Sequence, residues 1–105
     1  MSITKYGLFG KLKALPGQRQ ALADFLLEAA RLLHTASGCQ LYLVSTDVTD
    51  ADTIWITEVW DTKEDHDRSL QIPAIRELIG RAMPLLAERP EPGMTVNVLG
   101  GKGLA

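Results

Sequence analysis

The sequence predicts an α+β fold in which four antiparallel strands form one sheet and helices cover one of its faces. Segments rich in alternating apolar and β-branched residues occupy 3–14, 39–48, 53–60 and 94–99. Segments with a helical spacing of apolar residues lie between the first and second of these, and between the third and fourth. The polar turn 47–52 is too long for a tight two-residue hairpin, but it leads from one middle strand into the next, so these two strands are expected to pair antiparallel.

The segment 53–70, TIWITEVWDTKEDHDRSL, is predicted to be a strand followed by a short helix. Most of its residues up to Trp60 are β-branched or aromatic, which suits a pleated strand. Thr62 is a suitable N-cap, and Asp65 is placed to complete a capping box. Both faces of the strand carry a tryptophan and branched apolar residues, so it is expected to be buried on both sides. One face carries Ile54, Ile56, Glu58 and Trp60, and the other Thr53, Trp55, Thr57, Val59 and Asp61.

The clearest helix is predicted over 18–34, where apolar residues recur at intervals of three and four. The turn Leu15-Pro16-Gly17 precedes this helix, and Ser37-Gly38 follows it. In the strand 39–48, strict alternation puts alternate residues on opposite faces of the sheet. One face is then expected to carry Cys39, Leu41, Leu43 and Ser45, and the other Gln40, Tyr42, Val44 and Thr46.

Two prolines divide the second helical region of the chain. Pro73 is expected to start a helix, because proline is tolerated in the first turn. Pro84 lacks an N–H and would clash with a carbonyl one turn earlier, so this helix should kink or end near Met83. The resulting order, β-α-β-β-α-β, is typical of the ferredoxin-like fold. Since helices cover only one face, the apolar second face is expected to be covered by a second copy of the chain, giving a homodimer.

The chain has 105 residues, a length that predicts a single domain over 1–105. Its net charge of -2 provides no basic field for nucleic acid or for an anionic membrane surface. No apolar run approaches the roughly 18 residues of a membrane span, and the first residues lack the features of a signal peptide. Cys39 is the only cysteine, which fits a reducing compartment. We therefore expect a cytoplasmic protein with neither a nucleic-acid nor a membrane partner.

Three features together resemble a known family: Glu58-x-Trp60 followed six residues on by His66, the early GLFGKLKALPGQ with its amphipathic helix, and the late MTVNVL strand. They resemble the antibiotic biosynthesis monooxygenase (ABM) family. This resemblance implies a dimeric α+β barrel, with a pocket in each subunit between the sheet and the helices. Some relatives oxidise polycyclic phenols, anthrones or quinols with dioxygen and need neither metal nor flavin. Other relatives bind and degrade haem.

Trp60 and His66 are the candidate catalytic residues. The resemblance implies that Trp60 is a pocket wall that stacks on a flat aromatic substrate, and the alternative is a core residue under the first helix. His66 is interpreted either as the acceptor of a phenol proton or as an exposed helix residue beside acidic neighbours. Removing that proton yields an electron-rich phenolate, which can donate an electron to dioxygen.

Tyr6, Glu58, Arg76 and Leu41 are the candidate substrate-binding residues. Glu58 lies on the same strand face as the candidate tryptophan, and a buried carboxylate needs a partner. Arg76, Arg81 and Tyr6 are the partners that the sequence offers. A structural ion pair is a simpler interpretation of Glu58 than a general base.

No metal or cofactor site is predicted. The two histidines are far apart, and the sequence contains no CxxC or HxxxH pair and no glycine-rich phosphate cradle. Ile56 stands where some relatives carry a pocket asparagine, and Asn97 is the only asparagine of the chain. The leading hypothesis is a cofactor-independent monooxygenase that acts on a small aromatic substrate, either quinol-like or a polycyclic phenol. The alternatives are a non-catalytic dimeric ligand-binding or stress-response protein, and a haem-binding relative.

Overall fold

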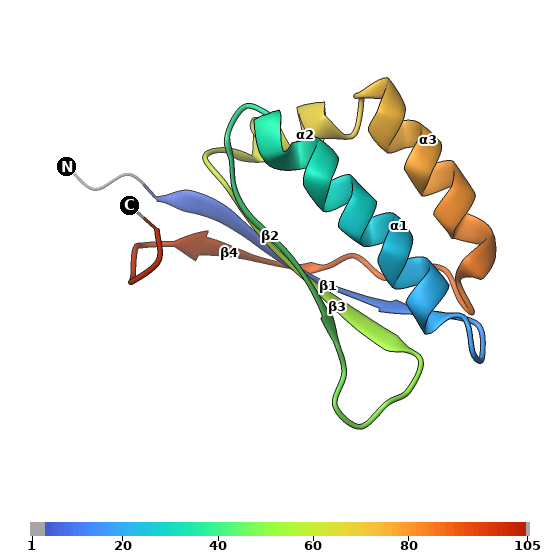
Figure 1. Cartoon of the computed structure of the whole chain (residues 1–105). Helices are drawn as coiled ribbons and strands as arrows, with labels where there is room; N and C mark the ends of the chain where they lie inside the picture. Colours follow the sequence, from blue (N-terminus) through green and yellow to red (C-terminus); the bar gives the residue numbers. More distant parts are fainter. Residues whose placement is uncertain (1–3, 105) are drawn as a thin grey trace.

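The computed structural model describes residues 4–104, which form one four-stranded antiparallel sheet with three α-helices on one side (Figure 1). Short 3-10 turns follow the first and the third helix, at Leu33–Thr35 and Met83–Leu85. The strand order is β2-β3-β1-β4, which confirms the predicted ferredoxin-like α+β fold. The elements in chain order are β1 (Lys5–Lys13), α1 (Arg19–Leu32), β2 (Cys39–Thr46), β3 (Thr53–Trp60), α2 (Lys63–Ser69), α3 (Pro73–Ala82) and β4 (Met94–Val98).

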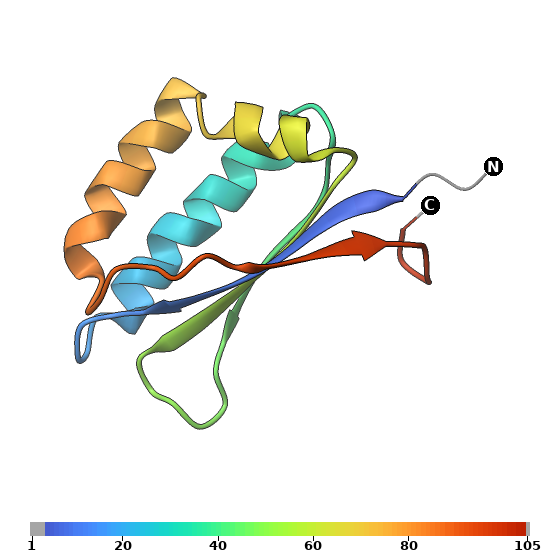
Figure 2. The same cartoon turned by 180° about the vertical axis from the view of Figure 1, so that it is seen from behind.

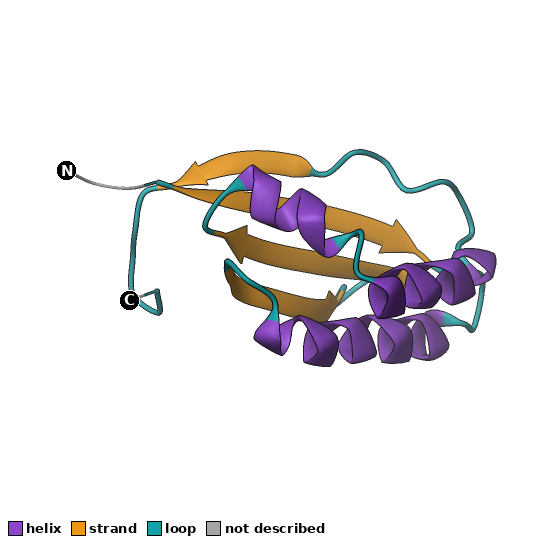
Figure 3. Ribbon diagram, turned by 90° about the horizontal axis from the view of Figure 1, so that it is seen from above, coloured by secondary structure: helices purple, strands orange, loops and turns teal. Residues whose placement is uncertain are grey.

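The helices form a single layer against one face of the sheet, as the view from behind also shows (Figure 2). Seen from above, α1 and α3 lie next to each other and α2 lies over the strands (Figure 3). No helix within residues 4–104 lies over the other face of the sheet. Among the described residues, no helix is both long enough and apolar enough to cross a membrane.

The strand register confirms the predicted alternation on β3. Tyr6 pairs with Trp60 and Leu12 pairs with Ile54, and all four side chains belong to the helix-covered face. Phe9 pairs with Thr57 on the opposite, uncovered face. The sheet is therefore apolar on both sides, as the pattern of β3 predicted.

The predicted orientation of Cys39 was wrong. A β-bulge between Cys39 and Leu41 adds one residue to β2 at the point where Cys39 pairs with Trp60. Cys39 consequently packs under the helices, beside Trp60, whereas Leu41 pairs with Val59 on the uncovered face. Strict alternation cannot hold across a bulge, because the extra residue reverses the faces on one side of it.

The helix starts and stops follow local sequence signals. Thr62 is the N-cap of α2, and its hydroxyl accepts a hydrogen bond from the Asp65 N–H at 3.0 Å. The Asp65 carboxylate does not close a capping box, because it accepts from the Arg68 guanidinium instead. Pro73 opens α3, and α3 ends at Ala82, one residue before the 3-10 turn that contains Pro84, as expected.

The core between sheet and helices consists of two clusters. One is built on Leu22 and Ile54, and the other on Leu33, Trp60 and Ile75. Tyr42 of β2 packs against both clusters, so it lies at the boundary between them. A cavity lined by residues of both clusters lies at this boundary.

Candidate functional site

The candidate site is a cavity of about 190 Å³ between the helix-covered face of the sheet and the helices. Its walls are almost entirely apolar. Polar side chains are confined to Tyr42, Glu58, His66 and Ser69, contributed by β2, β3 and α2. The apolar walls include Leu22, Phe25, Leu26, Leu33, Leu78 and Met83. Such a chamber favours a flat apolar ligand that presents a hydroxyl or carbonyl toward the polar residues.

His66 is the central polar residue of this cavity. It lies in α2, and Ser69 one turn later donates its hydroxyl to the His66 carbonyl at 2.6 Å. The imidazole is only 14% exposed and lies between two aromatic rings, with centroids 5.6 Å from Tyr6 and 5.8 Å from Trp60. The interpretation of His66 as an exposed surface residue is therefore wrong, since the side chain turns inward from the helix.

Glu58 lies next to His66 and is equally shielded, at 12% exposure. One of its carboxylate oxygens accepts a hydrogen bond from the Trp60 indole N–H at 2.9 Å, and the same oxygen is 3.9 Å from His66 Nε2. Burial raises the pKa of Glu58, against the opposing effects of the Trp60 hydrogen bond and the charge of His66. The partners that the sequence suggested, Arg76 and Arg81 among them, do not contact this carboxylate.

Asp67 orients the His66 ring from the solvent side. Its carboxylate lies 2.9 Å from His66 Nδ1. Hydrogen bonds from Lys63 and then from His66 lower the pKa of Asp67, so the carboxylate is ionised and can only accept. The proton of the neutral imidazole therefore sits on Nδ1, and Nε2 keeps a free lone pair on the side of Glu58.

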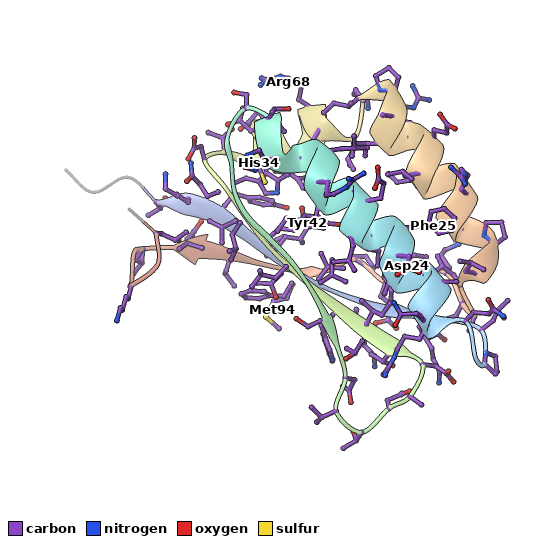
Figure 4. All side chains as sticks on the ribbon, in the orientation of Figure 1. Asp24, Phe25, His34, Tyr42, Arg68 and Met94 are labelled. Carbon is purple, nitrogen blue, oxygen red and sulfur yellow. The ribbon has the colours of Figure 1, made fainter. Side chains whose placement is uncertain are left out.

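Tyr42 is a cavity residue that the sequence analysis did not select. It is the cross-strand partner of Glu58, which puts the two side chains next to each other on the helix-covered face. Burial, together with the charge of Glu58, raises the pKa of Tyr42, so its hydroxyl stays protonated. Figure 4 shows Tyr42 beneath α1, on the side of the sheet opposite Met94. The register between the two middle strands would have identified it.

The structure brings together only some of the predicted site residues. Glu58 and His66 line the cavity, and Tyr6 and Trp60 contact His66 from outside it. Trp60 is fully buried, so the expected stacking of Trp60 on a substrate does not fit this structure, and the alternative of a core residue does. Leu41 pairs with Val59 on the uncovered face of the sheet, away from the cavity. Arg76 is exposed on α3 and does not line the cavity.

The arrangement is suited to moving a proton in an apolar space. A lone pair on His66 Nε2 lies beside an acid whose charged form is disfavoured by burial, and both line the cavity. Within residues 4–104, no group of three His, Cys, Asp or Glu side chains is close enough to hold a metal ion.

Comparisons with known proteins identify the family and agree with the fold. The family model for antibiotic biosynthesis monooxygenases matches residues 6–81. A crystal structure from Chloroflexus aurantiacus, described as a candidate antibiotic biosynthesis monooxygenase, is 42% identical, with a TM-score of 0.86 over 96% of this chain and 99% of its own. A protein of unknown function from Nitrosomonas europaea is 28% identical, with a TM-score of 0.79 over 97% of this chain and 96% of its own. A second Nitrosomonas europaea structure, also described as a candidate monooxygenase, is 11% identical, with a TM-score of 0.86 over 94% of this chain and 93% of its own. A search among curated proteins found no match.

Proposed function

Because the chain belongs to the antibiotic biosynthesis monooxygenase family, we propose that it oxidises a phenolic or quinol-like aromatic compound with dioxygen, without a cofactor. The observation that carries the proposal is the apolar cavity with the His66–Glu58 pair among its few polar groups. The apolar walls hold the ring, and the polar residues position its hydroxyl.

His66 accepts the phenol proton in this proposal. Its Nε2 atom and the nearest Glu58 oxygen are 3.9 Å apart, which is too long for a direct hydrogen bond. A substrate hydroxyl has one proton to donate, and in the cavity it donates this proton to Nε2 within the normal hydrogen-bond range. After the transfer, the imidazolium is flanked by the Asp67 carboxylate on Nδ1 and by Glu58 on Nε2, and both stabilise its charge.

The oxidation then uses electrons from the substrate alone. The phenolate gives one electron to dioxygen, and the resulting phenoxyl radical and superoxide join through a new carbon–oxygen bond on the ring. The hydroperoxide takes up the proton held by His66. Its O–O bond breaks as the ring carbon loses its hydrogen, which leaves a carbonyl on the ring and one water. One oxygen atom enters the product and the other leaves as water, so the substrate supplies all the electrons. The apolar walls keep bulk water away from the radical pair.

Oxygen uptake with a panel of hydroquinones tests this proposal. We expect His66→Gln to lower kcat/KM by about 10²–10⁴, the usual contribution of a general base. His34→Gln is the matched control, because His34 is the other histidine and lies exposed at the end of α1. Equal rates in the wild type and His66→Gln would instead favour a non-catalytic ligand-binding protein.

We also propose that the uncovered face of the sheet pairs with the same face of a second copy. Phe9, Leu43, Trp55 and Met94 are exposed large apolar residues on this face. An apolar surface of this kind is typical of an association site, and a two-fold axis makes it self-complementary. Sedimentation equilibrium tests the pairing with Leu43→Asp, expected to give monomers. Leu27→Asp on α1 is its control, because both leucines are 49% exposed and only Leu43 lies on the sheet.

A further inference from the structure

Two hollows lie on opposite sides of one phenylalanine. The inner cavity has a volume of about 190 Å³, and an outer groove between α1 and α3 has a volume of about 590 Å³. Phe25 of α1 and Leu78 of α3 line both hollows, so they form the wall between them. Figure 4 shows Phe25 in the space between α1 and α3.

The inner cavity has the volume of a single aromatic ring with its substituents. An apolar protein cavity of about 150 Å³ is known to hold one benzene molecule, and pockets for drug-sized ligands start at roughly 300 Å³. At about 190 Å³, the cavity leaves room for one or two hydroxyl groups on such a ring. A second fused ring adds as many carbon atoms as a leucine side chain holds, and on the side of α1 and α3 the wall formed by Phe25 and Leu78 leaves no space for them.

Phe25 is held in its place from the outer side. The Arg81 guanidinium lies over the Phe25 ring, with 5.1 Å between its central carbon and the ring centroid. The rest of the outer groove carries the carboxylates of Asp24, Glu28 and Glu77. An apolar ring that reached past Phe25 would therefore have to displace a stacked cation and enter a charged surface, which is unfavourable.

We infer that the inner cavity takes a compound with one hydroxylated aromatic ring, and that Phe25 sets this size limit. The inference rests on the proposed function for the phenolic character of the ligand. It narrows the substrate class from phenols in general to monocyclic phenols and hydroquinones, and it excludes the polycyclic substrates that the sequence left open.

Anaerobic titration calorimetry with phenol and 2-naphthol tests the inference, because binding is then measured without oxidation. The wild type is expected to bind phenol and to give no measurable heat with 2-naphthol. Phe25→Ala removes the wall and should raise the affinity for 2-naphthol by about tenfold or more, the usual effect of relieving a steric limit in an apolar pocket. Phenol binding should change by less than about threefold in the same variant.

Two variants make the measurement specific. Leu27→Ala changes an exposed leucine on the same helix, and it should leave both affinities as they are. Ala29→Leu fills the cavity from α1 and should weaken phenol binding by about tenfold or more. If Phe25→Ala does not fold, Phe25→Leu keeps an apolar wall and should show a smaller gain for 2-naphthol.

The possible outcomes separate this inference from the proposed oxidation. Equal binding of phenol and 2-naphthol by the wild type would overturn the size limit, and so would a folded Phe25→Ala without any gain. Absence of phenol binding would overturn the ligand class. Ring-size selectivity without oxygen uptake for any hydroquinone would leave the inference standing and refute the oxidation. Fast oxygen uptake with polycyclic quinols would support the oxidation and overturn the size limit.

Discussion

The two tryptophans of β3 allow a controlled measurement of what holds the site together. Each donates its indole N–H to a carboxylate: Trp60 to Glu58 at 2.9 Å, and Trp55 to Asp47 at 2.8 Å. Trp60 is 0% exposed and packs with Leu33 and Ile75, whereas Trp55 is 40% exposed on the uncovered face. Replacing each tryptophan by phenylalanine removes one indole–carboxylate hydrogen bond and the same set of ring atoms, once in the core and once on the uncovered face.

The cost of Trp60→Phe follows from its burial. A hydrogen bond to a charged group contributes about 1.5–3 kcal/mol, and its loss leaves the shielded Glu58 carboxylate without this donor. The smaller ring also leaves a void in the core, which costs roughly a further 1–2 kcal/mol. We therefore expect Trp60→Phe to lower the free energy of unfolding by about 2.5–5 kcal/mol. Trp55→Phe should cost less than about 1 kcal/mol, because water replaces the exposed bond.

Urea unfolding followed by circular dichroism measures both variants without relying on tryptophan fluorescence. Two protein concentrations are needed, because Trp55 lies on the proposed dimer face and its effect would then depend on concentration. NMR titration of Glu58 gives a second readout. The indole hydrogen bond favours the charged carboxylate, so Trp60→Phe should raise the pKa of Glu58 further. Equal costs for the two variants, or an unchanged Glu58 titration, would refute the role assigned to Trp60.

Three further outcomes are expected. Burial raises the pKa of Glu58, so the folded chain keeps the Glu58 proton to a higher pH than the unfolded chain does. The free energy of unfolding should therefore fall as pH rises above about 4.3. Urea unfolding measured across pH should show a smaller decline in Glu58→Gln. Gly38→Ala should lower the free energy of unfolding by about 1–3 kcal/mol, because φ is +83° and the new Cβ would overlap the Asp65 carboxylate. Gly80→Ala in α3 should raise it by about 0.5–1 kcal/mol, because the new Cβ contacts no other residue. Thermal unfolding of the two variants compares them. Ala29→Leu should raise the melting temperature while it weakens ligand binding, and a folded, destabilised Ala29→Leu that still binds phenol would show that the cavity is not where the ligand goes.

Local patterns predicted the elements of this fold because their causes are local. The hydroxyl of Thr62 caps α2 from its own turn, and Pro84 ends α3 through a clash with its own helix. The orientation of Cys39 depended instead on a bulge, which is set by how β2 pairs with β3 and not by the residues of β2 alone. Leu41 shares the uncovered face with Leu43, so it lies away from the site for which the sequence had selected it.

The site itself could be predicted only in part, for the same reason. Glu58 and His66 were selected by residue type and spacing, yet their contact depends on the angle at which α2 leaves β3. The sequence offered Arg76 as a partner for Glu58 because charge complementarity is readable from sequence, whereas distance is not. Tyr42 was not selected because its position opposite Glu58 requires the strand register, which the apolar pattern of β2 does not fix.

The cavity and the buried acid both oppose folding, and they occur at the same place. Leaving a void in a core costs roughly 24 cal/mol per Å³, so about 190 Å³ corresponds to an upper bound of about 4–5 kcal/mol, since part of the cavity opens to solvent. That cost is large beside the roughly 5–15 kcal/mol of net stability of a domain of this size. A single larger residue in place of Ala29 would remove much of the cost of the cavity. A glutamine in place of Glu58 would remove the cost of burying the carboxyl group. A chain shaped by stability alone would have closed the boundary between the two core clusters, so the open boundary beside His66 is best explained by a ligand that occupies it.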